Sequence, residues 1–75
     1  MNQPWFAVFL GEDQKPLRAE SGEPYSLMIA EDVADETTVV SDAAVFIGAD
    51  RVQGNVITRG EQSFMLVPAQ ELAAL

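Results

Sequence analysis

The stretch MIAEDVADETTVV, residues 28–40, sets four carboxylates between apolar and β-branched residues: Glu31, Asp32, Asp35 and Glu36. Carboxylates this dense suit a metal site, a mimic of nucleic acid or a solvated loop. Calcium-binding loops alternate oxygen ligands as D-x-D-x-D-G and add a distal glutamate. The spacing here does not match that pattern, and the stretch has no glycine for the sharp turn. We therefore interpret it as a solvated acidic loop that connects two buried segments.

The two flanks of the acids leave alternatives open. Residues 25–30, YSLMIA, favour a strand because the apolar run is short. If this run extended through the acids, it would form a helix with apolar residues at 29, 30, 33 and 34. Whether residues 26–35 form a strand or a helix is therefore open. Residues 37–48, TTVVSDAAVFIG, predict one or two strands with a bend at Ser41–Asp42, or alternatively a short helix with Asp42 as its N-cap.

The N-terminal third of the chain predicts one strand and two turns. Residues 4–10, PWFAVFL, are rich in aromatic and β-branched residues and apolar on both alternating faces, so both faces need a cover. Turn residues dominate segments 11–16, GEDQKP, and 21–24, SGEP. The residues LRAE between these turns suit a short strand.

The C-terminal third predicts a hairpin, a strand and a helix. Residues 52–56, VQGNV, contain the glycine and asparagine that tight hairpin turns need. A second turn at residues 59–62 leads to the strand SFMLV, residues 63–67. Pro68 is suited to the first turn of a helix over residues 68–75. The whole chain, 1–75, is thus predicted to be one mainly β domain of about six short strands with a short C-terminal helix.

The composition favours association between copies. A domain of 75 residues has a marginal core, and the absence of cysteine removes disulfides as a source of stability. Because 48% of the residues are hydrophobic at a net charge of −8, we expect a homo-oligomer that buries apolar faces between subunits. The possible interface residues are Trp5, Phe6, Phe9 and Tyr25.

Several classes of function are disfavoured. With 12 acids against 4 bases, the chain has no basic stripe for nucleic acid or for an anionic membrane surface. The start of the chain lacks the features of a signal peptide, so synthesis inside the cell is expected. The sequence contains no histidine and no nucleophile–base pair or metal spacing. We therefore expect no enzyme activity, no metal and no cofactor.

The order of segments resembles the head-decoration, or capsid-stabilising, proteins of tailed phages. The resemblance rests on Met28–Val33 as an apolar segment with an EDV-type acidic end, on Val45–Gly48, and on the glycine-containing turn within Val52–Ile57. It covers residues 16–60, and its motifs are patterns of apolar and acidic residues.

The resemblance implies a small β-tulip or barrel-like domain that assembles as a trimer. It also implies a structural role without catalysis, in which the protein is made in the host cytoplasm, binds the major capsid protein shell on the outside of the expanded head and stabilises it. Members of that family bind the shell with a flexible N-terminal arm, whereas this chain begins with the strand-like PWFAVFL. Whether this strand replaces the arm is open.

An alternative function is that of an acidic DNA mimic or inhibitor, which blocks the basic cleft of a host nuclease or defence complex. A net charge of −8 on 75 residues would allow carboxylates to imitate a phosphate track. A mimic should carry its acids as a stripe. Here four of the twelve acids gather in residues 31–36, and Glu12 and Asp13 lie together in a turn, which is more typical of ordinary loop solvation.

Overall fold

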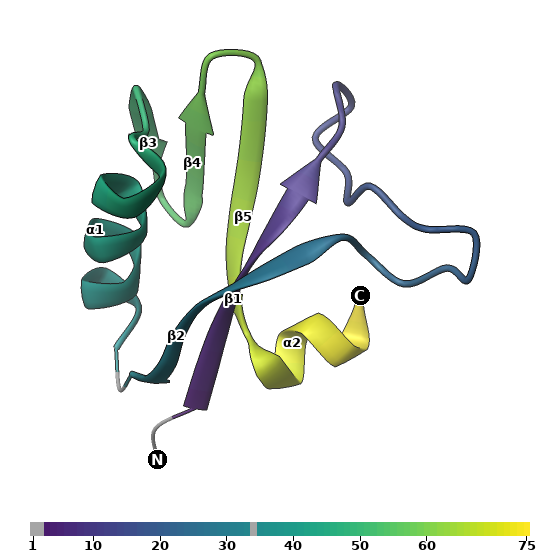
Figure 1. Ribbon diagram of the computed structural model, residues 1–75, viewed down its shortest axis with the longest axis horizontal. Coiled ribbons are helices and arrows are strands. Elements are labelled where there is room, and N and C mark those ends of the chain that lie inside the picture. Colours follow the sequence, from purple (N-terminus) through teal and green to yellow (C-terminus); the bar gives the residue numbers. More distant parts are fainter. Residues whose placement is uncertain (1–2, 34) are drawn as a thin grey trace.

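The computed structural model describes residues 3–33 and 35–75, and within them it has five strands in one sheet and two helices. All neighbouring strands are antiparallel, in the order β2-β1-β5-β4-β3, which leaves β2 and β3 at the two edges (Figure 1). The elements in chain order are β1 (Gln3–Leu10), β2 (Ser26–Val33), α1 (Glu36–Ile47), β3 (Arg51–Gln53), β4 (Val56–Arg59), β5 (Gln62–Pro68) and α2 (Ala69–Ala74). The predicted mainly β domain with a short C-terminal helix is confirmed, with five strands in place of about six.

Strand β1 lies inside the sheet between β2 and β5, and its two faces are buried against different parts of the chain. Trp5 and Ala7 belong to the core that β4, β5 and α1 complete. Val8 and Leu10 point to the opposite face and are also buried. Helix α2 contacts both β1 and β5. The prediction that PWFAVFL needs cover on both faces is thus met largely within one chain.

The main core lies between one face of the sheet and α1. Its buried members are Trp5, Ala7, Val39, Ala43, Ile57, Phe64 and Leu66. Two of them, Val39 and Ala43, are one helical turn apart and face the sheet together. Helix α1 is thus held in place by the burial of one narrow side.

The structure corrects the interpretation of residues 37–48 as one or two strands, because they belong to helix α1. The helix begins after Asp35, seven residues or about two turns earlier than the alternative helix with Asp42 as its N-cap. Apolar residues at 39, 40, 43, 44 and 47 repeat at helical spacing and meet the core. Gly48 ends the helix in the left-handed conformation, with φ of 78°. The β-branched residues TTVV locally favour a strand, but burial of a helical face outweighs that preference.

The structure also corrects the interpretation of residues 31–36 as a solvated loop. Strand β2 runs from Ser26 to Val33, so Glu31 and Asp32 belong to it, and Glu36 lies in the first turn of α1. For residues 26–33, the strand favoured by the short apolar run is the observed structure. The acids therefore stand at the junction of two regular elements.

The predicted hairpin and turns are present in the C-terminal half. Gly54 and Asn55 join β3 to β4, and Gly60 and Glu61 join β4 to β5. Gly54 and Gly60 have φ of 64° and 60°, values that glycine adopts without strain. In the N-terminal third, isolated bridges pair Leu10 with Pro16 and Arg18 with Pro24, so the segment LRAE forms bridges and no full strand.

Candidate functional site

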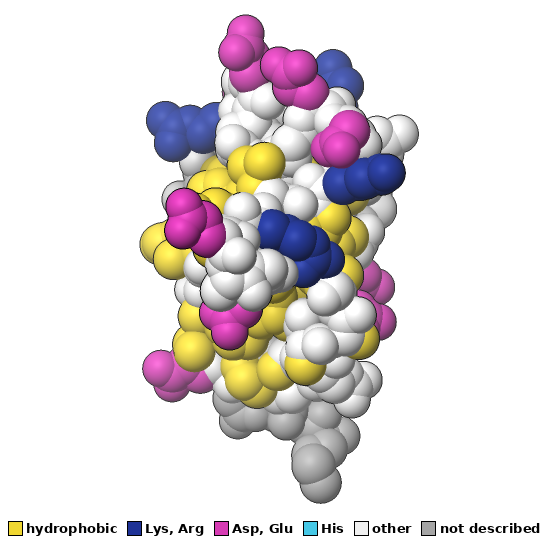
Figure 2. All heavy atoms as spheres, turned by 90° about the vertical axis from the view of Figure 1, so that its right-hand side faces the viewer, with side chains coloured by type: hydrophobic (Ala, Val, Ile, Leu, Met, Phe, Trp, Pro, Cys, Tyr) yellow, Lys and Arg dark blue, Asp and Glu magenta, His cyan; other side chains and the backbone are white. Residues whose placement is uncertain are grey.

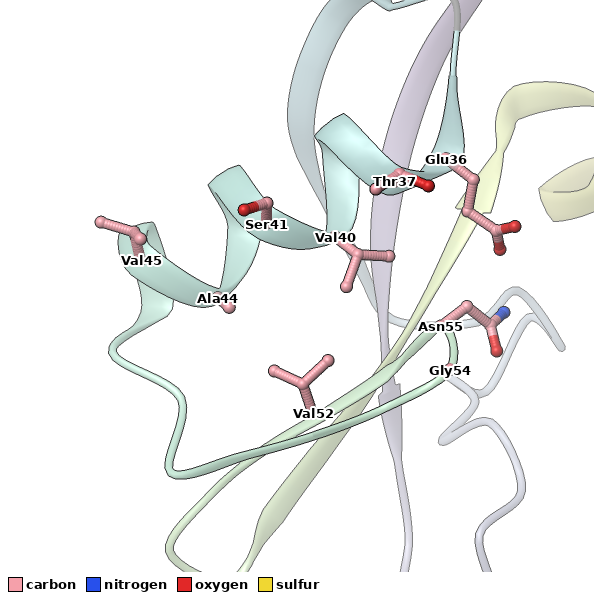
Figure 3. Close-up of a pocket in the computed structure, with 9 residues that line it drawn as sticks. All are labelled: Glu36, Thr37, Val40, Ser41, Ala44, Val45, Val52, Gly54 and Asn55. Atoms are coloured by element: carbon pink, nitrogen blue, oxygen red, sulfur yellow. The ribbon is translucent and has the colours of Figure 1, made fainter.

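An open groove lies between α1 and the β3–β4 hairpin and has a volume of about 810 Å³ (Figure 3). Val40 and Ala44 from the helix and Val52 from the hairpin form its apolar part. Its remaining lining residues are Glu36, Thr37, Ser41, Val45, Gly54 and Asn55. The groove is thus apolar along its length, with polar groups beside it.

The helical side of the groove follows from the spacing of its residues. Thr37, Val40, Ser41 and Ala44 are three or four residues apart, so they share one flank of α1 beside the buried side. Ser41 and Ala44 are small. This flank is therefore shallow enough for another backbone to approach closely.

The hairpin side is held in place by strand pairing and by one side-chain anchor. Val52 pairs with Ile57, whose side chain is fully buried in the core, so both point toward the side of the sheet that carries α1. The Asn55 side-chain amide donates to the Leu66 carbonyl at 3.1 Å, and the Leu66 amide donates to the Asn55 carbonyl at 2.8 Å. These bonds fasten the turn to β5, so the hairpin wall is supported.

Two large apolar side chains on α1 are exposed, and one of them lines this groove. Val45, which lines it, is 82% exposed, and Phe46 is 74% exposed. At the hairpin wall, Val52 is 50% exposed. Apolar side chains gathered on a surface mark sites of contact with other molecules more often than isolated ones do. The sequence interpretation missed these residues because it placed residues 45–47 in a strand. The apolar residues at 39, 40, 43, 44 and 47 repeat at helical spacing, and Val45 and Phe46 fall outside that repeat. This pattern could have indicated that both side chains are exposed on a helix.

Opposite charges lie near the two ends of α1. Asp35 and Glu36 lie at its N-terminal end, where the helix dipole favours negative charge. At the other end, the Arg59 Nη1 donates to the Ile47 carbonyl at 3.3 Å. This cation is therefore placed where the dipole is negative. The last turn of α1 has no basic residue of its own, so the cation at this end comes from β4.

Asp35 caps α1 through two hydrogen bonds from one residue. Its Oδ1 accepts from the Thr38 amide at 2.8 Å, and its Oδ2 accepts from the Thr38 hydroxyl at 2.9 Å. These bonds, first the one from the amide and then the one from the hydroxyl, lower the pKa of the Asp35 carboxyl below its ordinary value. The charged carboxylate is therefore the form that the folded helix prefers.

We expect Asp35→Ala to lower the melting temperature at pH 7 by a few degrees, because it removes the cap. Asp35→Asn keeps an acceptor for the Thr38 amide and should melt closer to the wild type. The folded-state pKa of Asp35 is lower than its unfolded value, so the carboxylate stabilises the fold above the ordinary carboxyl range. That contribution is lost as the pH falls through the lowered value.

The measurement is thermal unfolding followed by circular dichroism, from pH 7 down to about pH 3, near the ordinary aspartate pKa. The gap between the wild type and Asp35→Asn should begin to narrow at the acid end. A gap that stays constant or widens as the pH falls would contradict the assigned role of the carboxylate.

The four predicted interface residues lie in different environments. Trp5 is buried in the core with only 8% of its surface exposed. Phe6 is half-buried and, as its immediate neighbour on β1, points to the opposite face. Phe9 is half-buried, and its ring meets that of Phe64 edge to face at a centroid distance of 5.0 Å.

Tyr25 is the exposed member of that set, with 54% of its surface accessible. It lies beside Phe9, Leu17 and Ser26 around a hollow of about 180 Å³. The structure therefore brings Phe9 and Tyr25 together and separates Trp5 from Phe6. It places none of the four among the residues that line the α1 groove.

The charged residues on the face formed by the 11–25 segment and α2 do not form a single stripe. Figure 2 shows acidic and basic side chains interspersed on this face, with apolar side chains between them. Across the described ranges, no three acidic residues come together as a set of metal ligands. Neither of the two described helices is long and apolar enough to cross a membrane.

The chain matches no protein-family model, and comparison with curated proteins and with solved structures gives no significant match.

Proposed function

We propose that this protein is a non-catalytic structural protein that assembles with copies of itself through the groove beside α1. The observation that carries the proposal is the exposure of Val45 and Val52 at a groove whose apolar part extends to Val40 and Ala44. Burying each such side chain would stabilise an assembly by about 1.5–3 kcal/mol before the costs of association. The small size of the domain adds to the benefit of a partner.

Val45→Glu tests the proposal by placing a charge in the apolar groove. We expect the wild type to form a concentration-dependent oligomer in equilibrium sedimentation and the variant to sediment as a monomer. Burying an unpaired carboxylate at an interface is costly, whereas at an exposed helical position it costs the single chain little. Ser21→Glu is the matched control, because it adds the same charge in an exposed turn. A wild-type chain that remains a monomer at high micromolar concentration would overturn the proposal.

Decoration of a phage capsid is the particular role that the resemblance implies, and it stays a prediction. In that role the protein would lie on the virion surface, in contact with the major capsid protein shell. The test is co-sedimentation with purified expanded heads, compared with unexpanded heads as the control. Binding to expanded heads alone would support decoration. The absence of binding to either would leave self-assembly as the function to pursue.

A further inference from the structure

We infer that the occupant of the groove is helix α1 of a second copy, packed antiparallel across a two-fold axis. This inference rests on the proposed function, since it specifies how two copies meet. In a two-fold interface the same patch serves on both subunits and must complement itself. The groove meets that condition in shape, and Glu36 together with Arg59, whose side chain reaches the Ile47 carbonyl, meets it in charge.

The shape argument starts from the flank formed by Thr37, Val40, Ser41 and Ala44. It has the spacing by which one helix packs along another. The small side chains of Ser41 and Ala44 lie within it and allow the two helix axes to approach closely. A helix of 12 residues is about 18 Å long, so the partner helix would run along the whole of this flank. Its Val45 and Val40 would then meet the apolar wall at Val52.

The charge argument fixes the direction of the second helix. Antiparallel packing places Glu36 of one copy near the C-terminal end of the other helix, where Arg59 of the partner subunit lies. The same pair recurs on the other side of the two-fold axis. Antiparallel helix dipoles also attract each other. Parallel packing would instead bring the two acidic N-terminal ends together, in a protein that already carries a net charge of −8.

The polar groups of the groove favour a helix over a small polar ligand. Ligand pockets usually combine an apolar lining with a few converging polar groups. Here the Asn55 amide nitrogen already donates to the Leu66 carbonyl, and Thr37, Ser41 and Glu36 lie along one helix. The groove therefore offers a row of contacts along an axis, which is what another helix matches.

The test is a charge exchange between Glu36 and Arg59, measured by equilibrium sedimentation at 0.15 M salt to limit long-range repulsion, since the screening length is then about 8 Å. The single variants Glu36→Arg and Arg59→Glu each replace the Glu36–Arg59 contact with a like-charge pair. Because this contact occurs on both sides of the two-fold axis, each substitution creates two such pairs in the dimer. We expect each to weaken dimerisation by about ten-fold or more. The combined variant restores opposite charges, and we expect its dissociation constant to return to within about three-fold of the wild type.

Matched controls separate local pairing from net charge. Glu20→Arg makes the same charge change as Glu36→Arg but lies in the 11–25 segment. Arg51→Glu matches Arg59→Glu, and Arg51, the neighbour of Val52 on β3, points to the opposite side of the sheet. We expect Glu20→Arg to weaken dimerisation less than Glu36→Arg does. We likewise expect Arg51→Glu to weaken it less than Arg59→Glu does. Circular dichroism melting of every variant confirms that the chain remains folded.

The outcomes distinguish this inference from the proposed function. If the wild type associates and Val45→Glu is a monomer, but the combined variant is no better than the single ones, then the antiparallel pairing is wrong and self-assembly stands. A wild-type trimer would also overturn the two-fold contact, because a two-fold interface closes at a dimer. A wild-type monomer would overturn both.

Discussion

Trp5→Ala should lower the free energy of unfolding by about 3–5 kcal/mol, the range for truncating a large aromatic side chain in a core. Trp5 is only 8% exposed and belongs to the cluster that joins the sheet to α1. Its removal leaves a cavity beneath the helix, and a domain of this size has about 5–15 kcal/mol in total. We therefore expect a large loss of stability and, at 37 °C, a substantial unfolded population.

The measurement for Trp5→Ala is urea unfolding followed by circular dichroism, because the substitution removes the only tryptophan and its fluorescence. Phe46→Ala is the control, since its side chain is 74% exposed and its loss should change stability by about 0.5 kcal/mol or less. An interface role for Trp5 would give the opposite result. Assembly would then fall while the unfolding free energy of the single chain stayed close to that of the wild type.

Leu66→Ala should cost about 2–5 kcal/mol, because Leu66 is fully buried at the centre of the sheet. Leu66 pairs with Ala7 on β1, whose side chain is too small to fill the space that the truncated Leu66 side chain would leave. The substitution leaves in place both hydrogen bonds that Asn55 makes with the backbone of residue 66. The loss therefore measures packing and not the anchoring of the hairpin.

Met65→Ala is the matched control for Leu66→Ala. Met65 is the adjacent residue on β5, points to the other face of the sheet and is only half-buried. We expect it to cost clearly less than Leu66→Ala in the same urea titration. Equal losses would mean that the face opposite α1 contributes as much to stability as the core that contains Leu66.

The strands and turns could be predicted where local signals agreed with their neighbours. PWFAVFL and SFMLV have the composition of strands and form β1 and β5, which are adjacent interior strands of the sheet. VQGNV placed glycine and asparagine at a hairpin turn, where Gly54 has φ of 64°. In these segments, the side-chain type and the required backbone conformation lead to the same structure.

The candidate site could not be predicted, because it depends on a helix that local preference argues against. TTVV suits a strand by residue type, whereas the cap at Asp35 and the apolar positions 39, 40, 43, 44 and 47 suit a helix. Residue preferences differ by only a fraction of a kcal/mol per position. The burial of Val39 and Ala43 against the sheet therefore decided the outcome.

By itself, the sequence determined the mainly β character, the hairpin turns and the C-terminal helix, because each rests on interactions between residues near one another in the chain. Only the tertiary structure decided the strand order, the helical state of residues 36–47 and the groove between α1 and the hairpin. Those features depend on which apolar surfaces meet across the fold. That choice is made by total burial, to which residues far apart in the sequence, such as Ala7, Ala43 and Ile57, contribute together.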